Sequence, residues 1–172
     1  MQCFAGFVLA QSVGGSERVE VPVAYQVVSE ATGVPVDILF AVALAESAKS
    51  HNSQLLPWPW ALNIDGQSVY CSSLDEAVTQ SRQAIHNQQA IDLGLMQISW
   101  RWHRQRFHDP GQALIPIQNL KAGAMILREQ YDATGNWWEA VGRYHDPGED
   151  GESLKNAERY RARVRQHWEG AF

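Results

Sequence analysis

The sequence predicts a mostly α-helical single domain that contains one small β-hairpin. The chain has 172 residues, a length that allows one domain with a sizeable core. Apolar residues recur at intervals of three and four over most of the chain, which is the spacing of amphipathic helices. Only two short runs, on either side of Asp65-Gly66, have the pattern of paired strands. No internal repeat or low-complexity segment divides the chain further.

The helices are predicted from apolar spacing together with residues that start and stop helices. Pro22 and Gly33 suit the ends of a first helix, and a second helix follows from 34 to 50. Later helices are expected over 73–87, 101–107, 116–134 and 137–144, and a last one is expected to begin at Ser153. The inward residues of the first helix are expected to be Val23, Val27, Val28 and Ala31. Those of the last helix are expected to be Leu154, Ala157, Val164 and Trp168.

The segments between these helices are expected to be loops, apart from one hairpin. LLPWPW, residues 55–60, has two prolines and two tryptophans and is predicted to be a rigid extended loop. ALNI and QSVY, residues 61–64 and 67–70, form the predicted hairpin. In IDLGLMQISW, residues 91–100, Gly94 interrupts an initial alternation, so a tight loop leading into a helix is expected rather than a strand.

Residues 1–17 are interpreted as the remnant of a secretory signal followed by a loose segment, with the folded domain over 18–172. The apolar run 4–10 is too short to span a membrane and ends in small residues that a signal peptidase accepts. No basic residue precedes this run, so the true start could lie upstream. We expect export to the periplasm without a transmembrane span. Removal of Cys3 would leave Cys71 unpaired.

Composition and motifs exclude several kinds of chemistry. The net charge of −5 disfavours a nucleic-acid partner. The six histidines form no pair with metal-ligand spacing, so no metal or other cofactor is predicted. There is no G-x-S-x-G motif, and Cys71 has no evident catalytic partner, which favours a buried thiol. No glycine-rich loop indicates a phosphate site.

Acid–base chemistry by a carboxyl group is what remains. Glu46 shares a helical face with three apolar residues, Ile38, Leu39 and Val42. Burial would raise the pKa of this carboxyl group and make it a proton donor near neutral pH, although at the last turn it could also simply reach water. Stacking faces for a sugar polymer could come from Trp58, Trp60, Trp137 and Trp138. Hydrogen bonds to it could come from Asn63, Gln97 and Tyr144.

Four short motifs follow one another along the chain: AES at 45–47, GLMQ at 94–97, AVGRYH at 140–145, and Tyr160 with Val164. In this order they resemble the soluble-lytic-transglycosylase (SLT) domain of glycoside hydrolase family 23, whose relatives include goose-type lysozyme. The resemblance covers roughly residues 20–168 and implies a lysozyme-like fold that binds peptidoglycan. The IDLGLMQ and AVGRYH forms are similar to enzymes that accompany conjugation or secretion machines, which implies such an apparatus as a partner.

The resemblance implies a role for each matched residue. Glu46 is the implied catalytic acid, and Ser47 is the serine that supports the site. Met96 and Gln97 correspond to the pair that lines the groove. Together with Asn63 from the residue reasoning above, the predicted substrate-binding residues are Ser47, Asn63, Met96, Gln97, Tyr144, His145 and Tyr160. His145 stands where the family pattern, usually written AYN, has Asn, and Gly142-Arg143 replace small residues.

The reaction implied is cleavage of the bond between N-acetylmuramic acid (MurNAc) and N-acetylglucosamine (GlcNAc) with formation of a 1,6-anhydro ring. One carboxyl group serves there as acid and then as base. A lysozyme-type hydrolase remains an alternative, and it needs a second carboxylate, for which Asp65 and Asp92 are candidates. A non-catalytic peptidoglycan-binding module is the other alternative, against which the intact Glu46-Ser47 pair argues.

Overall fold

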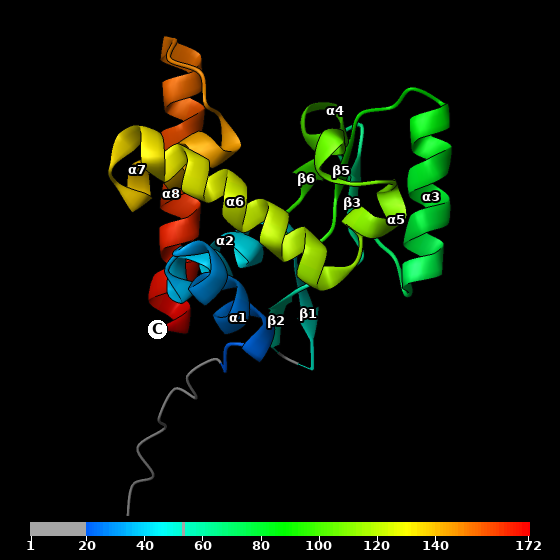
Figure 1. The fold of residues 1–172 in the computed structure, drawn as a ribbon, viewed down its shortest axis with the longest axis horizontal. Coiled ribbons are helices and arrows are strands. Elements are labelled where there is room, and N and C mark those ends of the chain that lie inside the picture. Colours follow the sequence, from blue (N-terminus) through cyan, green and yellow to red (C-terminus); the bar gives the residue numbers. More distant parts are fainter. Residues whose placement is uncertain (1–19, 53) are drawn as a thin grey trace, which may run out of the picture.

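The computed structural model describes residues 20–52 and 54–172, so the predicted signal segment 1–17 and Cys3 lie outside the described residues. Five helices form an α lobe, and one of them, α6, extends from this lobe toward the rest of the molecule (Figure 1). These helices are α1 (Val23–Thr32), α2 (Val36–Ser47), α6 (Pro116–Thr134), α7 (Trp137–His145) and α8 (Gly151–Ala171).

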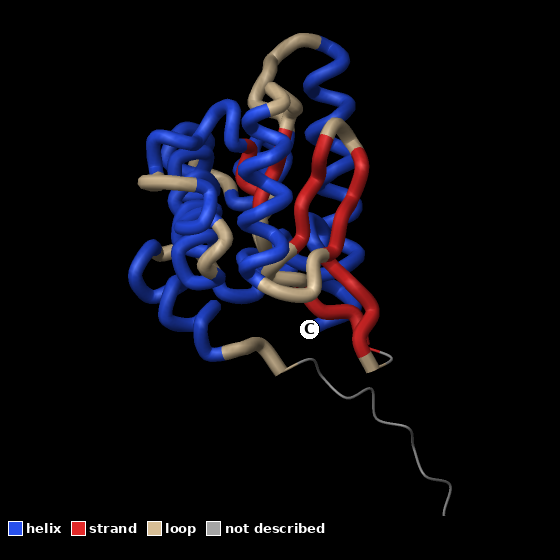
Figure 2. Tube along the Cα trace, turned by 90° about the vertical axis from the view of Figure 1, so that its right-hand side faces the viewer, coloured by secondary structure: helices blue, strands red, loops and turns tan. Residues whose placement is uncertain are grey.

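A second lobe is built on a four-stranded antiparallel sheet with the order β4-β3-β5-β6. Its strands are β3 (Ala61–Ile64), β4 (Gln67–Tyr70), β5 (Ile91–Leu93) and β6 (Ile98–Ser99). The helices of this lobe are α3 (Leu74–His86), α4 (Trp100–His103), the 3₁₀ turn η1 (Arg104–Arg106) and α5 (Pro110–Ala113). A separate hairpin, β1 (Ala48–His51) with β2 (Gln54–Pro57), continues directly from α2. Figure 2 shows the strands on one side of the molecule and most helices on the other.

Each lobe has its own hydrophobic core. The larger core is centred on α2, in which eight of twelve residues are buried, among them Phe40 and Leu39. The smaller core lies between the four-stranded sheet, α3 and α5, and contains Leu62, Leu93 and Leu114. Because α2 is surrounded on nearly every side, a polar residue near its end reaches solvent only where the lobes separate.

The structure confirms the mostly α-helical domain and the principal local predictions. Helix α6 has the predicted bounds, and Gly135 ends it in the left-handed conformation that glycine favours. The predicted hairpin forms with Asp65-Gly66 as its turn. Ser73 caps α3 by accepting a hydrogen bond from the Glu76 N–H.

Other predictions were wrong in ways that tertiary packing explains. Residues 54–57, predicted to be loop, form β2, while 91–93 and 98–99 form strands that complete the sheet. Helix α1 buries Tyr25 and Val28, whereas Val23 is 70% exposed, because α1 packs across α6 along a different face. In α8, Tyr160 is buried and Leu154 is exposed. The cap of α8 is Asp150, which accepts the N–H groups of residues 152 and 153.

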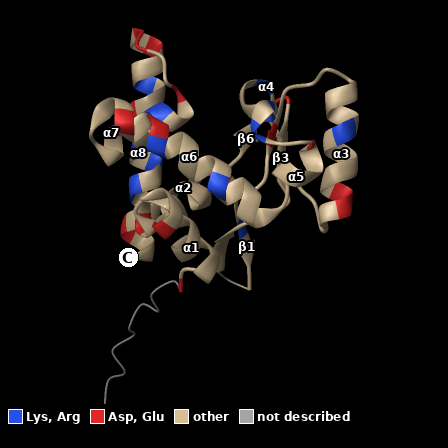
Figure 3. Cartoon of the chain, viewed as in Figure 1, with Lys and Arg blue, Asp and Glu red and all other residues tan. Residues whose placement is uncertain are grey.

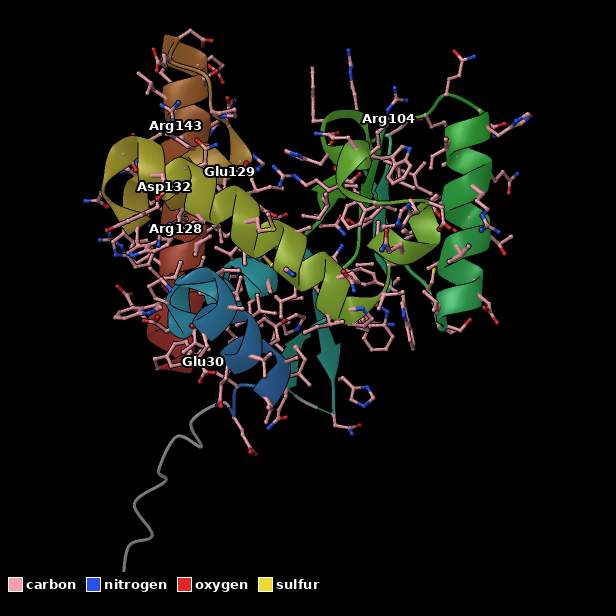
Figure 4. All side chains as sticks on the ribbon, in the orientation of Figure 1. Glu30, Arg104, Arg128, Glu129, Asp132 and Arg143 are labelled. Atoms are coloured by element: carbon pink, nitrogen blue, oxygen red, sulfur yellow. The ribbon has the colours of Figure 1, made fainter. Side chains whose placement is uncertain are left out.

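Ion pairs on the outer surface of α6 are of the kind that stabilise a helix only weakly. Arg128 and Asp132 are one turn apart with their side chains 2.8 Å apart, and both are largely exposed (Figure 4). In residues 20–52 and 54–172, no single helix is long and apolar enough to cross a membrane. Only α1 and α2 taken together satisfy length and composition, and they are bent by 119° at their break.

Candidate active site

Glu46 lies in the last turn of α2, where the core helix meets the space between the two lobes. It opens onto a cavity of about 440 Å³. The α lobe contributes α2, α7 and α8 to its wall, and the other lobe contributes the sheet and α4. The lining residues are Ala45, Glu46, Asn63, Ser68, Asp92, Gln97, Ser99, Trp102, His145 and Arg163.

The environment of Glu46 keeps about half of its carboxyl groups protonated at neutral pH. Burial among apolar residues raises its pKa from 4.5 to about 7. The Tyr160 hydroxyl donates a 2.6 Å hydrogen bond to Oε1, which favours the ionised form and opposes the rise, as does the positive charge of Arg163. No described residue hydrogen-bonds Oε2, so this oxygen is the one available to exchange a proton with a ligand.

Tyr160 and His145 form a rigid wall beside Glu46. Their rings stack with centroids 4.6 Å apart and an interplanar angle of 1°. Arg163 covers Tyr160, with its guanidinium carbon 5.1 Å from the ring centroid. Burial, reinforced by Arg163, lowers the pKa of His145, so its imidazole is neutral at physiological pH.

A row of four polar side chains faces Glu46 from the sheet. Asn63 is the cross-strand partner of Ser68 on one side and of Asp92 on the other, and Asp92 is the partner of Ser99. Cross-strand partners project from the same face of a sheet, and all four residues line the cavity. The Asn63 Oδ1 atom is buried without a hydrogen-bond partner in the described chain. Such an atom is costly unless a ligand supplies a donor.

Asp92 is the second carboxyl group of the cavity. Burial raises its pKa, which a hydrogen bond from Ser99 partly offsets, and its charge in turn raises the pKa of Glu46. Asp65, the other predicted candidate, lies outside the cavity. Its carboxylate accepts hydrogen bonds from the Gln89 side chain and the Ala90 N–H, which makes it a turn residue.

The turn at 94–97 is held from three directions. Gly94 and Gln97 have φ angles of +75° and +42°, and a Cβ on Gly94 would lie 2.6 Å from the Asn119 side-chain nitrogen. Buried Asn119 accepts the Met96 N–H and donates to two backbone carbonyls, those of residues 93 and 113. The Tyr144 hydroxyl donates to the Met96 carbonyl at 2.6 Å.

The residues predicted to bind substrate therefore fall into two groups. Asn63, Gln97 and His145 line the cavity with Glu46, and Tyr160 contacts the Glu46 carboxyl group directly. Ser47, Met96 and Tyr144 instead hold the backbone. Ser47 is buried and donates to the Leu95 carbonyl at 2.8 Å, and the Met96 side chain packs in the core against Gly123.

The tryptophans predicted as stacking faces are packed against the protein itself. Trp58 donates its indole N–H to the Cys71 carbonyl, and the Trp60 ring packs edge-on against the Trp58 ring. Trp137 stacks on Tyr131 and Trp138 packs against Trp168.

The tryptophan on the cavity wall is Trp102, which is 65% exposed. Sequence reasoning missed it. Its position five residues after Gln97, in a short segment with few apolar residues, was the available signal.

The remaining chemistry-bearing groups do not form a further centre. Cys71 is a buried free thiol whose pKa is raised, first by burial and then by Glu76. Over the described ranges, no three His, Cys, Asp or Glu side chains are grouped so as to hold a metal ion.

A core helix that ends in a protonatable glutamic acid, facing a cleft between an α lobe and a small sheet, defines an acid–base enzyme with a lysozyme-like fold. The family model described as "Transglycosylase SLT domain" matches residues 24–165, and the chain belongs to this family. Membership implies lytic transglycosylase activity on cell-wall peptidoglycan. No curated protein and no solved structure matches the chain significantly.

Proposed function

We propose that this protein is a lytic transglycosylase of glycoside hydrolase family 23 that cleaves the β-1,4 bond from MurNAc to GlcNAc and leaves a 1,6-anhydro-MurNAc end. The observation that carries the proposal is the burial of Glu46 at the cavity between the lobes, with Tyr160 bonded to its Oε1. Burial raises the pKa of this carboxyl group to about 7, so it can give up a proton at neutral pH and take one back in the same turnover.

The reaction balances with one carboxyl group. Glu46 donates its proton to the glycosidic oxygen as the bond from this oxygen to the MurNAc anomeric carbon breaks. The carboxylate then removes the proton of the MurNAc 6-hydroxyl as that oxygen bonds to the anomeric carbon. Water is not consumed, and Glu46 ends the cycle protonated. Tyr160 supports both steps, because its hydrogen bond to Oε1 stabilises the carboxylate that exists between them.

The cavity wall supplies groups suited to binding a neutral glycan. The buried Asn63 Oδ1 needs a hydrogen-bond donor, which an acetamido N–H or a sugar hydroxyl provides. The exposed face of Trp102 suits the apolar face of a pyranose ring. Gln97 is fixed by hydrogen bonds from its Nε2 to the carbonyls of Ala61 and Gly94, so its position is set before substrate arrives.

Hydrolysis is the second candidate, because Asp92 lines the same cavity as Glu46. A carboxylate on the opposite wall could activate a water molecule in an inverting mechanism. Asp92 can act as this base only while its carboxyl group is ionised. Burial raises its pKa, so a larger fraction of Asp92 is protonated at a given pH than of an ordinary Asp. The product separates the two reactions, since hydrolysis leaves a reducing end and transglycosylation leaves an anhydro end.

Mass spectrometry of the fragments released from purified peptidoglycan tests the proposal, with wild type and Glu46→Gln in parallel. We expect wild type to release fragments lighter by one water than hydrolysis products. Glu46→Gln is expected to lose at least about 100-fold in rate, the usual scale of acid–base catalysis. Reducing-end fragments that disappear in Asp92→Asn would establish the hydrolase. Binding to peptidoglycan with no fragments from wild type would indicate a binding module.

We further propose that the enzyme acts in the periplasm and opens the wall locally for a conjugation or secretion apparatus. The apolar run 4–10 and the IDLGLMQ and AVGRYH motifs support this setting. Fractionation of cells that produce the full chain tests the location, and recovery only from the cytoplasm would contradict it.

A further inference from the structure

A second cavity of about 380 Å³ lies beside the catalytic one along α8. It is lined by His145, Asn156, Arg159, Tyr160 and Arg163. His145 and Arg163 line both cavities, so the two cavities adjoin at these side chains, beside the stacked His145–Tyr160 pair. A substrate that extends past these side chains from Glu46 would enter the second cavity.

The charges in the second cavity are positive and only weakly compensated. Arg163 lies over the Tyr160 ring and forms no ion pair with any described Asp or Glu. Arg159 pairs with Glu152 at 3.3 Å, but both side chains are 70% exposed, and such pairs are weak. The Asp146 carboxylate is nearby and accepts a hydrogen bond from the Asn156 amide, but it forms no ion pair with Arg159 or Arg163. Figure 3 shows that basic residues recur along α8.

We infer that the second cavity binds a carboxylate carried by the MurNAc residue next to the cleaved bond. This inference rests on the proposed function and names the part of the substrate that the enzyme recognises beyond the sugar rings. The glycan backbone of peptidoglycan is uncharged, and its carboxylates belong to the peptide stem or, where the stem has been removed, to the lactyl group of MurNAc.

The geometry favours a carboxylate over other ligands for two reasons. Two guanidinium groups line a space large enough for a short acidic chain, and a guanidinium binds carboxylates through two parallel hydrogen bonds. The lactyl ether places its carboxyl carbon within a few bonds of the MurNAc ring, and the two cavities share His145 and Arg163, so a ring held at Glu46 would bring this group close to the second cavity.

Binding measurements in the Glu46→Gln background test the inference, because they do not depend on which product the enzyme makes. We would compare Arg159→Gln with Arg165→Gln. Arg165 lies on the same helix but covers Trp138 and lines neither cavity. The ligands are soluble strands with peptide stems, strands freed of stems by an amidase, and a neutral GlcNAc oligomer.

We expect Arg159→Gln to weaken the binding of carboxylate-bearing strands roughly three- to tenfold, as for one partly exposed charge-assisted contact, and to leave the neutral oligomer unaffected. Arg165→Gln should bind all three ligands like its parent. Loss confined to stem-bearing strands identifies the stem as the source, and loss confined to amidase-treated strands identifies the lactyl carboxylate, which is an amide wherever the stem is attached. Loss on both kinds of strand shows that the cavity accepts either carboxylate.

An equal loss on the neutral oligomer, or no loss on any strand, would overturn the inference while leaving the proposed function intact. If the Glu46→Gln parent binds none of the strands, the inference and the proposed substrate fail together. Thermal melting of both arginine variants shows that they are folded.

Discussion

Replacing Glu46 by Gln tests the electrostatics of the site without any substrate. Glu46 has a pKa of about 7 in the folded protein, because it is buried, against 4.5 for an ordinary glutamic acid. Between these two pH values the folded state binds the Glu46 proton more tightly than the unfolded chain does. Stability therefore falls as pH rises through this interval, and the loss is complete above about pH 7.

The magnitude follows from the size of the pKa rise. At about 1.4 kcal/mol per pH unit between 4.5 and 7, ionised Glu46 costs the folded state up to about 3.5 kcal/mol. Gln has nearly the same shape, carries no charge and can still accept the Tyr160 hydrogen bond. We expect Glu46→Gln to match wild type near pH 4 and to exceed it by up to about 3.5 kcal/mol at pH 8, or roughly 7–14 °C in Tm.

Urea unfolding and thermal melting of both proteins from pH 4 to 8.5 measure this difference. Glu30→Gln is the control, because Glu30 is exposed on α1, away from the cleft (Figure 4). The difference in stability between Glu30→Gln and wild type should not grow as the pH rises from 4 to 8.5. If Glu46→Gln shows no gain between pH 5 and 8, Glu46 is not the desolvated acid that the proposed mechanism requires.

Three further perturbations test the hydrogen bond to the acid, the turn beside it and the aromatic wall. The wild-type cleavage rate should fall about tenfold per pH unit above pH 7. The Tyr160 hydrogen bond lowers the pKa of Glu46, so Tyr160→Phe should raise this pKa and move the alkaline fall in rate to higher pH. A pH–rate profile that keeps its alkaline limb would contradict this. Gly94→Ala should lose about 2–4 kcal/mol in urea unfolding, because its Cβ would lie 2.6 Å from a buried amide. Gly66→Ala, with nothing within 4 Å, should lose clearly less, and equal losses would refute the packing argument. Trp102→Ala should raise KM for glycan strands roughly tenfold with little change in kcat, and an unchanged KM would exclude Trp102 as a binding face.

Local signals were sufficient for several elements. Pro116 and Gly135 bound α6 because each imposes its own backbone conformation regardless of what packs nearby. The Asp65-Gly66 turn likewise depends on the backbone conformation of two adjacent residues, and Ser73 caps α3 by accepting an N–H three residues away. These features depend on neighbours in the sequence, so the sequence predicts them.

Elements whose partners are distant in the sequence were predicted poorly. Strand β5 exists because Asp92 pairs with Asn63, and β6 exists because Ser99 pairs with Asp92. The β1–β2 hairpin has mostly exposed or half-exposed side chains and therefore lacks an alternating apolar signal. The inward faces of α1 and α8 depend on which helices cross them.

By itself, the sequence predicted the helical class, the ends of the best helices and Glu46 as the candidate acid, since a carboxyl group on the apolar face of a helix must be neutralised, paired or solvated. Only the tertiary structure decided what surrounds that acid. Tyr160 reaches Glu46 across 114 residues of sequence, the polar row is assembled from four strands, and Trp102 rather than the packed tryptophans lines the cavity. These contacts form when two lobes with separate cores meet, and side-chain spacing along one helix or strand does not encode how two such surfaces dock.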